Sequence, residues 1–266
     1  MRVLVCVLIL FALALPARAE ECDITWETFG EDFEAIFEAP FHMEGDAAYL
    51  TLGVTAVTGA SIIWWDDDIN GWVQRKPDTF AYHAFHKFSR LASWYGENNT
   101  NAMITYGAVI GAVALGGWIA DDDYVVDTAA IMAQSGLFSF GLNVAAKMLI
   151  GRARPHVGRG PHDFQFLTSP TNSEMHSFLS GHTANAFALA GAAAGRHPHW
   201  YVEVPGYAFA VAAGLQRVDS GSHWVSDVIS GAFFGYAISE LMVDRNECSD
   251  DGGNAPGPTV SLSFNF

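Results

Sequence analysis

The sequence contains few basic residues. Its 266 residues include 13 Lys and Arg against 29 Asp and Glu, which gives a formal net charge of −16 at pH 7. A nucleic-acid-binding protein needs a basic surface that neutralises phosphates, so this balance argues against nucleic acid as a partner. In such an acidic chain, a stretch that gathers many of the cations indicates a site for an anion.

Cysteine is scarce as well, with three in the chain. Cys6 lies in an N-terminal apolar run, while Cys22 and Cys248 lie near opposite ends of the remaining chain. In an oxidising compartment these two form either one disulfide or two free thiols, and the sequence leaves both open. Cys22 follows two glutamates rather than a small residue, which argues against a lipid-modified N-terminus.

The first 19 residues have the pattern of a secretory signal peptide. A charged start at Arg2 is followed by an apolar run and by the small-residue ending Ala17-Arg18-Ala19. We expect cleavage after Ala19 and export to the periplasm or cell envelope. The alternative is an uncleaved membrane anchor, for which a run of about 13 residues is short against the roughly 20 needed to span. Loss of Arg2 and Arg18 takes the net charge from −16 to −18.

The remaining chain predicts one all-α domain, a single helical bundle of about six core helices. Residues 20–46 form an amphipathic N-terminal segment that we expect to dock on the body. The bundle covers residues 47–246, and 247–266 form a flexible tail whose last residues alternate like a short strand. Long apolar segments cover residues 47–65, 102–120, 127–150, 182–196, 200–216 and 224–243, and the connection from Phe80 to Tyr95 has its own amphipathic pattern.

Two aspartate triplets follow the first two apolar segments, at residues 66–68 and 121–123. Acid at a helix C-terminus opposes the helix dipole, so the triplets are interpreted as solvated loops. Several apolar segments are long enough to cross a bilayer, but a buried bundle has the same pattern. Because cleavage would start the chain outside and three spans would carry Lys147 to the cytoplasm, the sequence favours a soluble or peripheral bundle over a multispanning protein.

The first of three polar fragments runs from Lys147 to Pro155. Proline disfavours the α conformation at the residue before it, so a helix ends there. Lys147 then lies on the last turns and Arg154 in the following turn, and both can reach a common anion. The plain alternative is a pair of surface cations at a helix end. Arg152, which either assists from behind or is exposed, is left outside the site.

The second fragment, Ser180-Gly181-His182, precedes an apolar helix. Ser180 is a natural N-cap, and the amide of Gly181 at the helix start can bind an anion. His182, in the first turn, can donate a proton to a leaving group. The alternative is an ordinary capping motif.

The third fragment runs from Arg217 to Asp227. Asp227 lies four residues after His223, so on a helix both share one face. The carboxylate can then hydrogen-bond one ring nitrogen and leave the other as a nucleophile. Arg217, at the end of the preceding helix, adds a third cation. A structural His–Asp pair is the alternative.

The order K-x6-R-P, S-G-H and R-x5-H-x3-D resembles the signature of the type 2 phosphatidic acid phosphatase (PAP2) superfamily, which includes bacterial class A acid phosphatases and vanadium haloperoxidases. The resemblance covers Lys147 to about Met242. Leu179 stands where the family usually has Pro, which we expect to loosen the loop that presents Ser180. Gln216 stands where the family usually has Ser.

The resemblance implies a metal-independent phosphatase without a cofactor. It implies that His223 attacks phosphorus to give a phosphohistidine, that Asp227 orients it and that His182 protonates the leaving group. The implied phosphate-binding residues are Lys147, Arg154, Ser180, Gly181 and Arg217. Two alternatives are a vanadate-dependent haloperoxidase and a catalytically silent envelope scaffold. The substrate stays open among lipid phosphates, prenyl diphosphates and soluble phosphomonoesters, and so do membrane association and oligomeric state.

Overall fold

The computed structural model describes residues 26–43 and 45–246. The predicted signal peptide, Cys22, Cys248 and the tail from residue 247 lie outside the described residues. Within the described ranges the chain forms helices joined by turns and loops, with two isolated bridges at Arg152 as the only strand-like pairing. The all-α prediction is confirmed.

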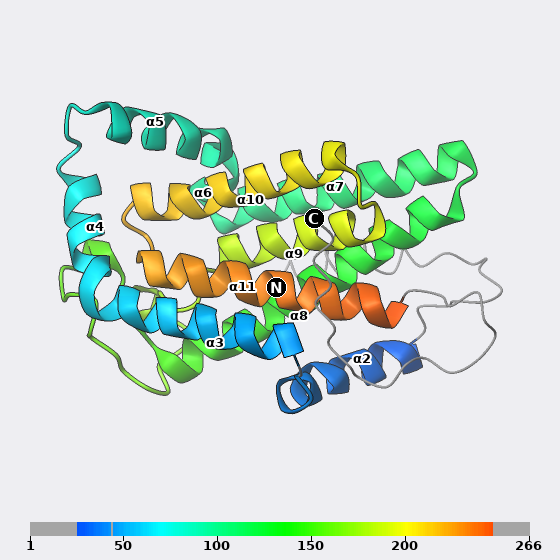
Figure 1. Ribbon diagram of the computed structural model, residues 1–266, viewed down its shortest axis with the longest axis horizontal. Helices are drawn as coiled ribbons and strands as arrows, with labels where there is room; N and C mark the ends of the chain where they lie inside the picture. Colours follow the sequence, from blue (N-terminus) through cyan, green and yellow to red (C-terminus); the bar gives the residue numbers. More distant parts are fainter. Residues whose placement is uncertain (1–25, 44, 247–266) are drawn as a thin grey trace.

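Six long helices make the bundle (Figure 1). They are α3 (Gly45–Ala60), α7 (Asn99–Ala120), α8 (Asp123–Ile150), α9 (Gly181–Arg196), α10 (Trp200–Asp219) and α11 (Val225–Asn246). Shorter elements are α2 (Trp26–Glu38), η1 (Ala39–Phe41), η2 (Ser61–Trp65), α4 (Asp66–Gln74), α5 (Phe80–Ser89), η3 (Arg90–Ala92), α6 (Ser93–Glu97), η4 (Pro155–Val157) and η5 (Ser173–Met175).

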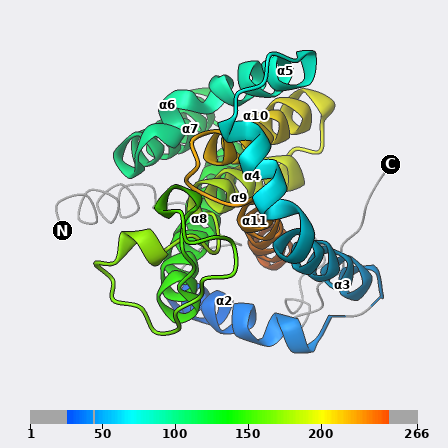
Figure 2. The ribbon, with the colours of Figure 1, turned by 90° about the vertical axis from the view of Figure 1, so that its left-hand side faces the viewer.

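Helix α9 lies at the centre of the bundle, packed against α8, α10 and α11 (Figure 2). Its buried positions are mostly alanine, and small side chains let the neighbouring helix axes approach closely. The buried alanines are Ala184, Ala186, Ala188, Ala190, Ala192 and Ala194. The polar fragments at the ends of α8, α9 and α10 are therefore carried by helices that touch one another.

Helices α9 and α11 approach each other closely. A Cβ atom added to Gly235 would lie 1.9 Å from the carbonyl oxygen of Ala184, and one added to Gly231 would lie 2.7 Å from that of Ser180. The backbone amide of Ser180 also donates to the carbonyl of Asp227 at 3.0 Å. The second and third polar fragments are thus joined through backbone contacts.

Helix α2 docks on the bundle, as the sequence predicts. The ring of Phe29 stacks on that of Phe138 in α8 with centroids 4.7 Å apart. The carboxylate of Asp32, which is 3% exposed, accepts a hydrogen bond from Gln134 and pairs with Arg245. The buried acid on the docking face is thereby neutralised and hydrogen-bonded.

The first aspartate triplet differs from its prediction as a solvated loop. The helix that begins as α3 continues through a π-helical turn, η2, into α4, which starts at Asp66. Asp67 and Asp68 are exposed, but Asp66 is buried and paired with Arg152. The expectation holds for the first two residues of the second triplet, since the exposed Asp121 and Asp122 form the turn between α7 and α8, while the exposed Asp123 begins α8.

Three helical stretches are long and apolar enough to cross a membrane: 45–74, 99–120 and 123–150. Large apolar side chains on α7 face outward; Trp118 is 75% exposed, Ile119 70% and Leu115 54%. A soluble bundle would leave these side chains in water, and large contiguous apolar patches are rare on soluble proteins. The structure therefore favours a membrane protein over the soluble or peripheral bundle that the sequence favoured.

Candidate active site

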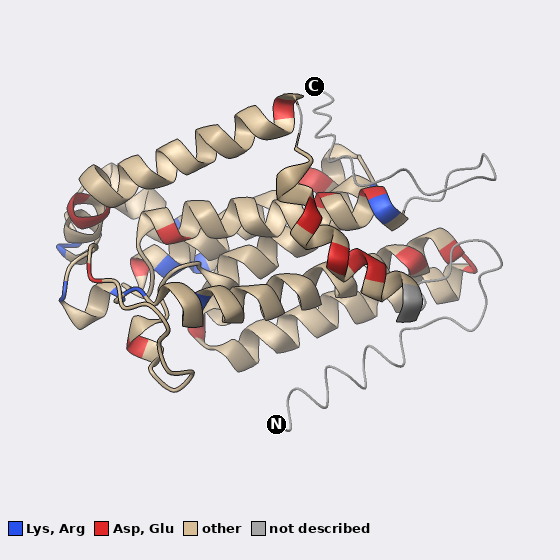
Figure 3. Cartoon of the chain, turned by 90° about the horizontal axis from the view of Figure 1, so that it is seen from below, with Lys and Arg blue, Asp and Glu red and all other residues tan. Residues whose placement is uncertain are grey.

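A pocket of about 580 Å³ opens at the end of the bundle where α8 ends and α9 begins. Most Lys and Arg residues gather at this end, on the left of Figure 3. Six of the eight predicted site residues line the pocket, and the remaining two, Ser180 and Asp227, are fully buried. The six are Lys147, Arg154, Gly181, His182, Arg217 and His223.

Lys147 fixes the loop that leads into α9. Its Nζ atom donates to the carbonyl of His176 at 3.0 Å and also to that of Leu179. Asn143, one turn earlier on α8, donates to the same Leu179 carbonyl at 3.4 Å. Leu179 is itself buried. The loop with leucine in place of the family proline is therefore held by α8, whereas the sequence led us to expect a looser loop.

The two arginines enter the pocket from different elements. Arg154 donates through Nε to the carbonyl of Ser173 at 2.9 Å, and burial lowers its pKa. Arg217, which is 6% exposed, donates to the carbonyl of Gly96 and, at 3.2 Å, to Oε1 of Gln216. Burial, and then the charge of Arg154, lower the pKa of Arg217 to about 10, so it is still a cation at neutral pH.

Helix α9 begins at Gly181, so its first backbone amides have no acceptor within the helix. A side chain at this position would crowd α8, because an added Cβ would lie 2.9 Å from Oδ1 of Asn143. The carbonyl of His182 accepts from the hydroxyl of Tyr95 at 2.8 Å, and the two rings meet edge to face. The start of α9 is thus fixed against α6 and α8.

The imidazole of His182 lies in a cationic, buried setting. Burial, followed by the charge of Arg217, lowers its pKa to about 3. Its Nε2 atom is buried and has no hydrogen-bond partner in the described part of the chain. This ring is therefore neutral near pH 7 when no anion is bound.

Ser180, which the sequence placed among the phosphate-binding residues, turns its hydroxyl toward Thr183 and does not line the pocket. The residue is the N-cap of α9, but its Oγ atom pairs with Oγ1 of Thr183 at 2.8 Å. The side chain is fully buried. Ser180 therefore anchors the loop through its side chain and through its backbone bond to Asp227.

The ring of His223 is oriented by a carbonyl rather than directly by Asp227. Its Nδ1 atom lies 2.7 Å from the carbonyl oxygen of Ser177 and 3.7 Å from Oδ2 of Asp227. The predicted His–Asp hydrogen bond assumed that both residues sit on one helix, but α11 begins at Val225, after His223. A carbonyl only accepts, so Nδ1 carries the proton and Nε2 carries the lone pair.

The electrostatic setting keeps His223 neutral. The side chain is 2% exposed. Burial, followed by the positive charges of Lys147, Arg154 and Arg217, holds its pKa well below the usual value of 6.5. A neutral ring with a free Nε2 that lines the pocket has the properties of a nucleophile.

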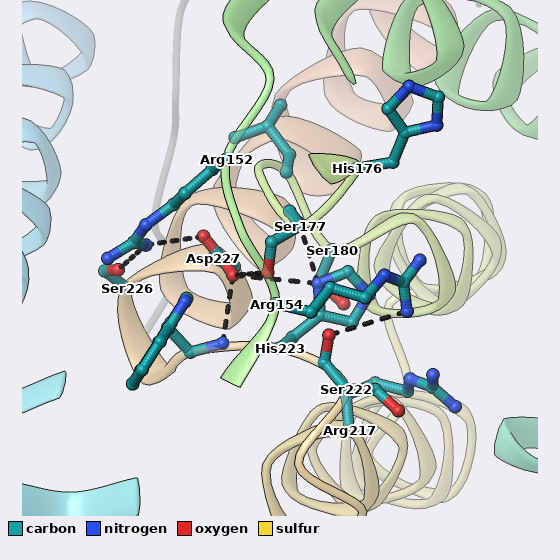
Figure 4. A network of polar contacts seen from close by, with 12 residues as sticks. Arg152, Arg154, His176, Ser177, Ser180, Arg217, Ser222, His223, Ser226 and Asp227 are labelled. Atoms are coloured by element: carbon teal, nitrogen blue, oxygen red, sulfur yellow. Dashed lines mark hydrogen bonds and ion pairs between the residues drawn. The ribbon is translucent and has the colours of Figure 1, made fainter. Parts of the chain in front are cut away.

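Asp227 is held by three donors behind His223 (Figure 4). Its Oδ1 atom pairs with Nη1 of Arg152 at 2.7 Å, and its Oδ2 atom accepts from Oγ of Ser177 at 2.5 Å and from the amide of Trp224 at 2.9 Å. Ser177 therefore links the carboxylate to the histidine, since its hydroxyl donates to one and its carbonyl accepts from the other.

Arg152, which the sequence-based interpretation left outside the site, is fully buried beside it. A signal was available for it, because a cation two residues before Arg154 in a chain with few cations is unusual. Ser177 gave no signal, since both its carbonyl and its hydroxyl contact residues that are distant in the sequence. His176 and Asn185 also line the pocket and had not been predicted. Within the described ranges, no group of three or more His, Cys, Asp or Glu side chains is placed to hold a metal ion.

Comparison with known proteins agrees with the sequence motifs. Residues 124–245 match the family model described as the PAP2 superfamily. The chain is 34% identical to a lipid A 1-phosphatase of Porphyromonas gingivalis over 132 residues. This alignment covers 45% of this chain and 29% of that protein. It is 36% identical over 118 residues to a lipid A 1-phosphatase of Rhizobium johnstonii, covering 44% and 48%.

The chain thus spans less than half the length of each of these two relatives. A crystal structure of a transmembrane PAP2-type phosphatidylglycerolphosphate phosphatase from Bacillus subtilis aligns over 91% of this chain and 92% of that one. Its identity is 16% and its TM-score 0.28, too low to support a shared arrangement. The match to the PAP2 superfamily model covers residues 124–245 and includes all eight predicted site residues.

Proposed function

We propose that this protein is a metal-independent phosphatase that hydrolyses lipid phosphates through a phosphohistidine intermediate. The observation that carries the proposal is that His223, with its proton on Nδ1, shares one pocket with the cations Lys147, Arg154 and Arg217. An oriented neutral imidazole beside several cations suits attack on a phosphoryl group. A silent scaffold has no need for this combination.

In the proposed complex, the three cations and the Gly181 amide hold the non-bridging phosphoryl oxygens. They neutralise the charge on these oxygens, a task that Mg²⁺ performs in many phosphoryl-transfer enzymes. Arg154 and Arg217 supply planar forks that match two oxygens at once, and Lys147 supplies a point charge. The preorganised positions of these groups stabilise the charge as it develops in the transition state.

The proposed reaction has two steps. Nε2 of His223 attacks phosphorus, the bond to the leaving oxygen breaks, and His182 donates a proton to that oxygen. In the resulting phosphohistidine, Nδ1 keeps its proton and donates it in a hydrogen bond to the carbonyl of Ser177, which stabilises the positive ring. Water then attacks phosphorus while His182 accepts a proton, the N–P bond breaks, and inorganic phosphate leaves.

The substrate class follows from the relatives and from the surface. Both relatives described above are named for a lipid phosphate. Two of the helices beside the pocket, α7 and α8, are long and apolar enough to cross a membrane, so a substrate anchored in the bilayer can present its phosphate there. A phosphatase is therefore favoured over the haloperoxidase alternative. We also propose, from residues 1–19, that the protein is exported to the cell envelope.

The purified protein in detergent micelles is expected to release phosphate from a lipid phosphomonoester and from p-nitrophenyl phosphate, with kcat/KM higher for the lipid. EDTA is expected to change either rate less than about twofold, because the cations act in place of a metal. Strong loss with EDTA that a divalent ion restores would overturn metal independence. No release from either substrate would overturn the phosphatase proposal.

Phosphate binding is expected to draw a proton onto His182. Burial and the charge of Arg217 lower the pKa of His182 to about 3 when no phosphate is bound. A bound dianion offsets the cations and raises this pKa, so binding takes up a proton and becomes tighter as pH falls. Calorimetry with inorganic phosphate at about pH 8, in buffers of different ionisation enthalpy, measures the uptake; at that pH phosphate itself is mostly dianionic.

The matched control for proton uptake is His182→Gln, which keeps a polar side chain but cannot titrate. This variant is expected to take up fewer protons per bound phosphate than the wild type, by as much as one. Equal uptake by the two proteins would show that His182 is not the group that is protonated.

A further inference from the structure

The buried ion pairs of Arg152 extend from Asp227 to Asp66, in a helix that supplies no described lining residue of the pocket. On the basis of the proposed function, we propose that Asp66 is a positioning residue for His223. It shares the charge of Arg152 with Asp227, and this leaves Asp227 enough negative charge to support the nucleophile.

The carboxylate of Asp66 is bound on both oxygens. Oδ2 pairs with Nη2 of Arg152 at 2.7 Å and accepts from Oγ of Ser226 at 2.6 Å. Oδ1 accepts from the backbone amide of Ser226 at 2.9 Å. Ser226 lies directly before Asp227, and its hydroxyl also contacts Nη1 of Arg152 at 2.7 Å. Asp66 therefore holds both the guanidinium and the first turn of α11.

The backbone brings Asp66 to this place through the π-helical turn η2. Its amide donates to the carbonyl of Ser61, five residues earlier, and such an insertion rotates the following residues around the helix axis. Asp66 is 1% exposed, whereas Asp67 and Asp68 face outward. Single π-helical turns are frequent at functional sites. A charged residue inside a long apolar stretch is also costly unless it is paired, which favours a role for this one.

The charges of the network decide how Asp227 acts on His223. Asp66, Arg152 and Asp227 are all fully buried and together carry a net charge of −1. In a setting of low dielectric, Arg152 with a single carboxylate partner would cancel the charge of Asp227. Because Asp66 also pairs with Arg152, the positive charge of Arg152 is divided between two carboxylates, and the network keeps one negative charge beside the ring.

That remaining charge is the one that favours a positive His223 ring. The groups facing the ring from the other elements are Lys147 from α8, Arg154 from the loop, Arg217 from α10 and His182 from α9. A positive charge on any of them opposes a positive ring. The carboxylate of Asp227, whose Oδ2 atom lies 3.7 Å from Nδ1, attracts a positive ring. The developing positive charge on His223 during attack thus depends on the network.

The test compares Asp66→Asn with the double variant Asp66→Asn/Arg152→Gln. The single change takes the network from −1 to zero, whereas the double change returns it to −1. In Asp66→Asn we expect kcat to fall on the order of ten- to a hundredfold, as for partners that orient a histidine ligand, with phosphate affinity little changed. The acid limb of kcat/KM should move to lower pH by on the order of one unit.

In the double variant the acid limb should return toward that of the wild type, although two ion pairs are gone. A purely structural role predicts the opposite, since the double variant loses more contacts than the single one. Asp67→Asn, the adjacent exposed carboxylate, is the matched control and should leave kcat and the acid limb unchanged. Asp66→Ser is made in parallel, in case Asp66→Asn does not fold.

Each outcome decides. The active fraction of every variant is taken from the stoichiometry of phosphate binding, so misfolding does not count as lost kcat. An unchanged acid limb of kcat/KM in the folded single variant would overturn the role of Asp66. A double variant whose kcat is lower than that of the single variant would overturn it as well. If neither single variant binds phosphate, Asp66 serves the fold instead. A wild type that releases no phosphate contradicts the proposed function, whereas an active wild type with unaffected Asp66 variants contradicts only this inference.

Discussion

His223→Gln is expected to lower kcat on the order of 10⁴-fold or more while the protein still binds phosphate. Loss of a nucleophile removes the covalent route, and losses of this size are typical when a catalytic unit loses its reacting group. Glutamine can still donate a hydrogen bond to the Ser177 carbonyl that Nδ1 contacts in the wild type. The cations Lys147, Arg154 and Arg217 remain, so phosphate affinity should change only a few-fold.

The measurement pairs turnover of a lipid phosphate with calorimetric binding of inorganic phosphate in the same preparation. His83→Gln, at an exposed histidine of α5 that pairs with Asp78, is the control and should keep wild-type turnover. In the wild type, quenching with alkaline detergent during turnover should trap a phosphoprotein that is stable in alkali and labile in acid, and the variant should lack it. Near wild-type turnover by His223→Gln would remove His223 from its proposed role.

The helices could be predicted because each is a long apolar run between clear breaks. The predicted segment 127–150 lies inside α8, and 200–216 lies inside α10. The exception is the end of the first segment at Asp66. A charge triplet normally marks the surface, and no local pattern indicates that one of three adjacent aspartates turns inward. That outcome depends on Arg152, 86 residues further along the chain.

The pocket residues could be predicted for a different reason. Lys147, Arg154 and Arg217 stand out because the chain has few cations, and the motifs place them at helix ends that meet in the bundle. The partners that orient the nucleophile could not be predicted in this way. Ser177 contacts His223 through its backbone carbonyl, which every residue has, and its hydroxyl contacts Asp227, 50 residues further along the chain, so no local pattern marks it.

The spacing of His223 and Asp227 shows the limit of reasoning from helical periodicity. A separation of four indicates one face only if both residues are helical. Here the helix starts between them, and the Asp227 side chain caps the amide of Trp224. The pair is therefore close but joined through Ser177, a third residue that comes from another loop.

The arrangement of the three fragments depends on the contact between α9 and α11. At this contact α11 has glycine at two positions where a larger residue would not fit. Gly231 and Gly235 lie one turn apart on α11 and face the backbone of Ser180 and Ala184 on α9. Close helix contacts of this kind use small residues because a side chain would separate the backbones. The start of α9, with Gly181, is held against α11 by this contact.

Gly235→Ala is expected to destabilise the protein by about 1–3 kcal/mol or more, the usual cost of overpacking. The added Cβ would lie 1.9 Å from the Ala184 carbonyl oxygen, and backbone atoms cannot move aside without shifting a helix.

Gly53→Ala on α3 is the matched control, since its added Cβ meets no atom within 4 Å and the better helix propensity of alanine adds up to about 1 kcal/mol. Thermal unfolding in detergent should therefore give a lower Tm for Gly235→Ala and an equal or higher Tm for Gly53→Ala. Turnover should fall with the first variant, because a shift of α9 moves Gly181 and His182 away from the cations. Equal Tm values for the two variants would mean that α9 and α11 are not in the close contact on which the pocket depends.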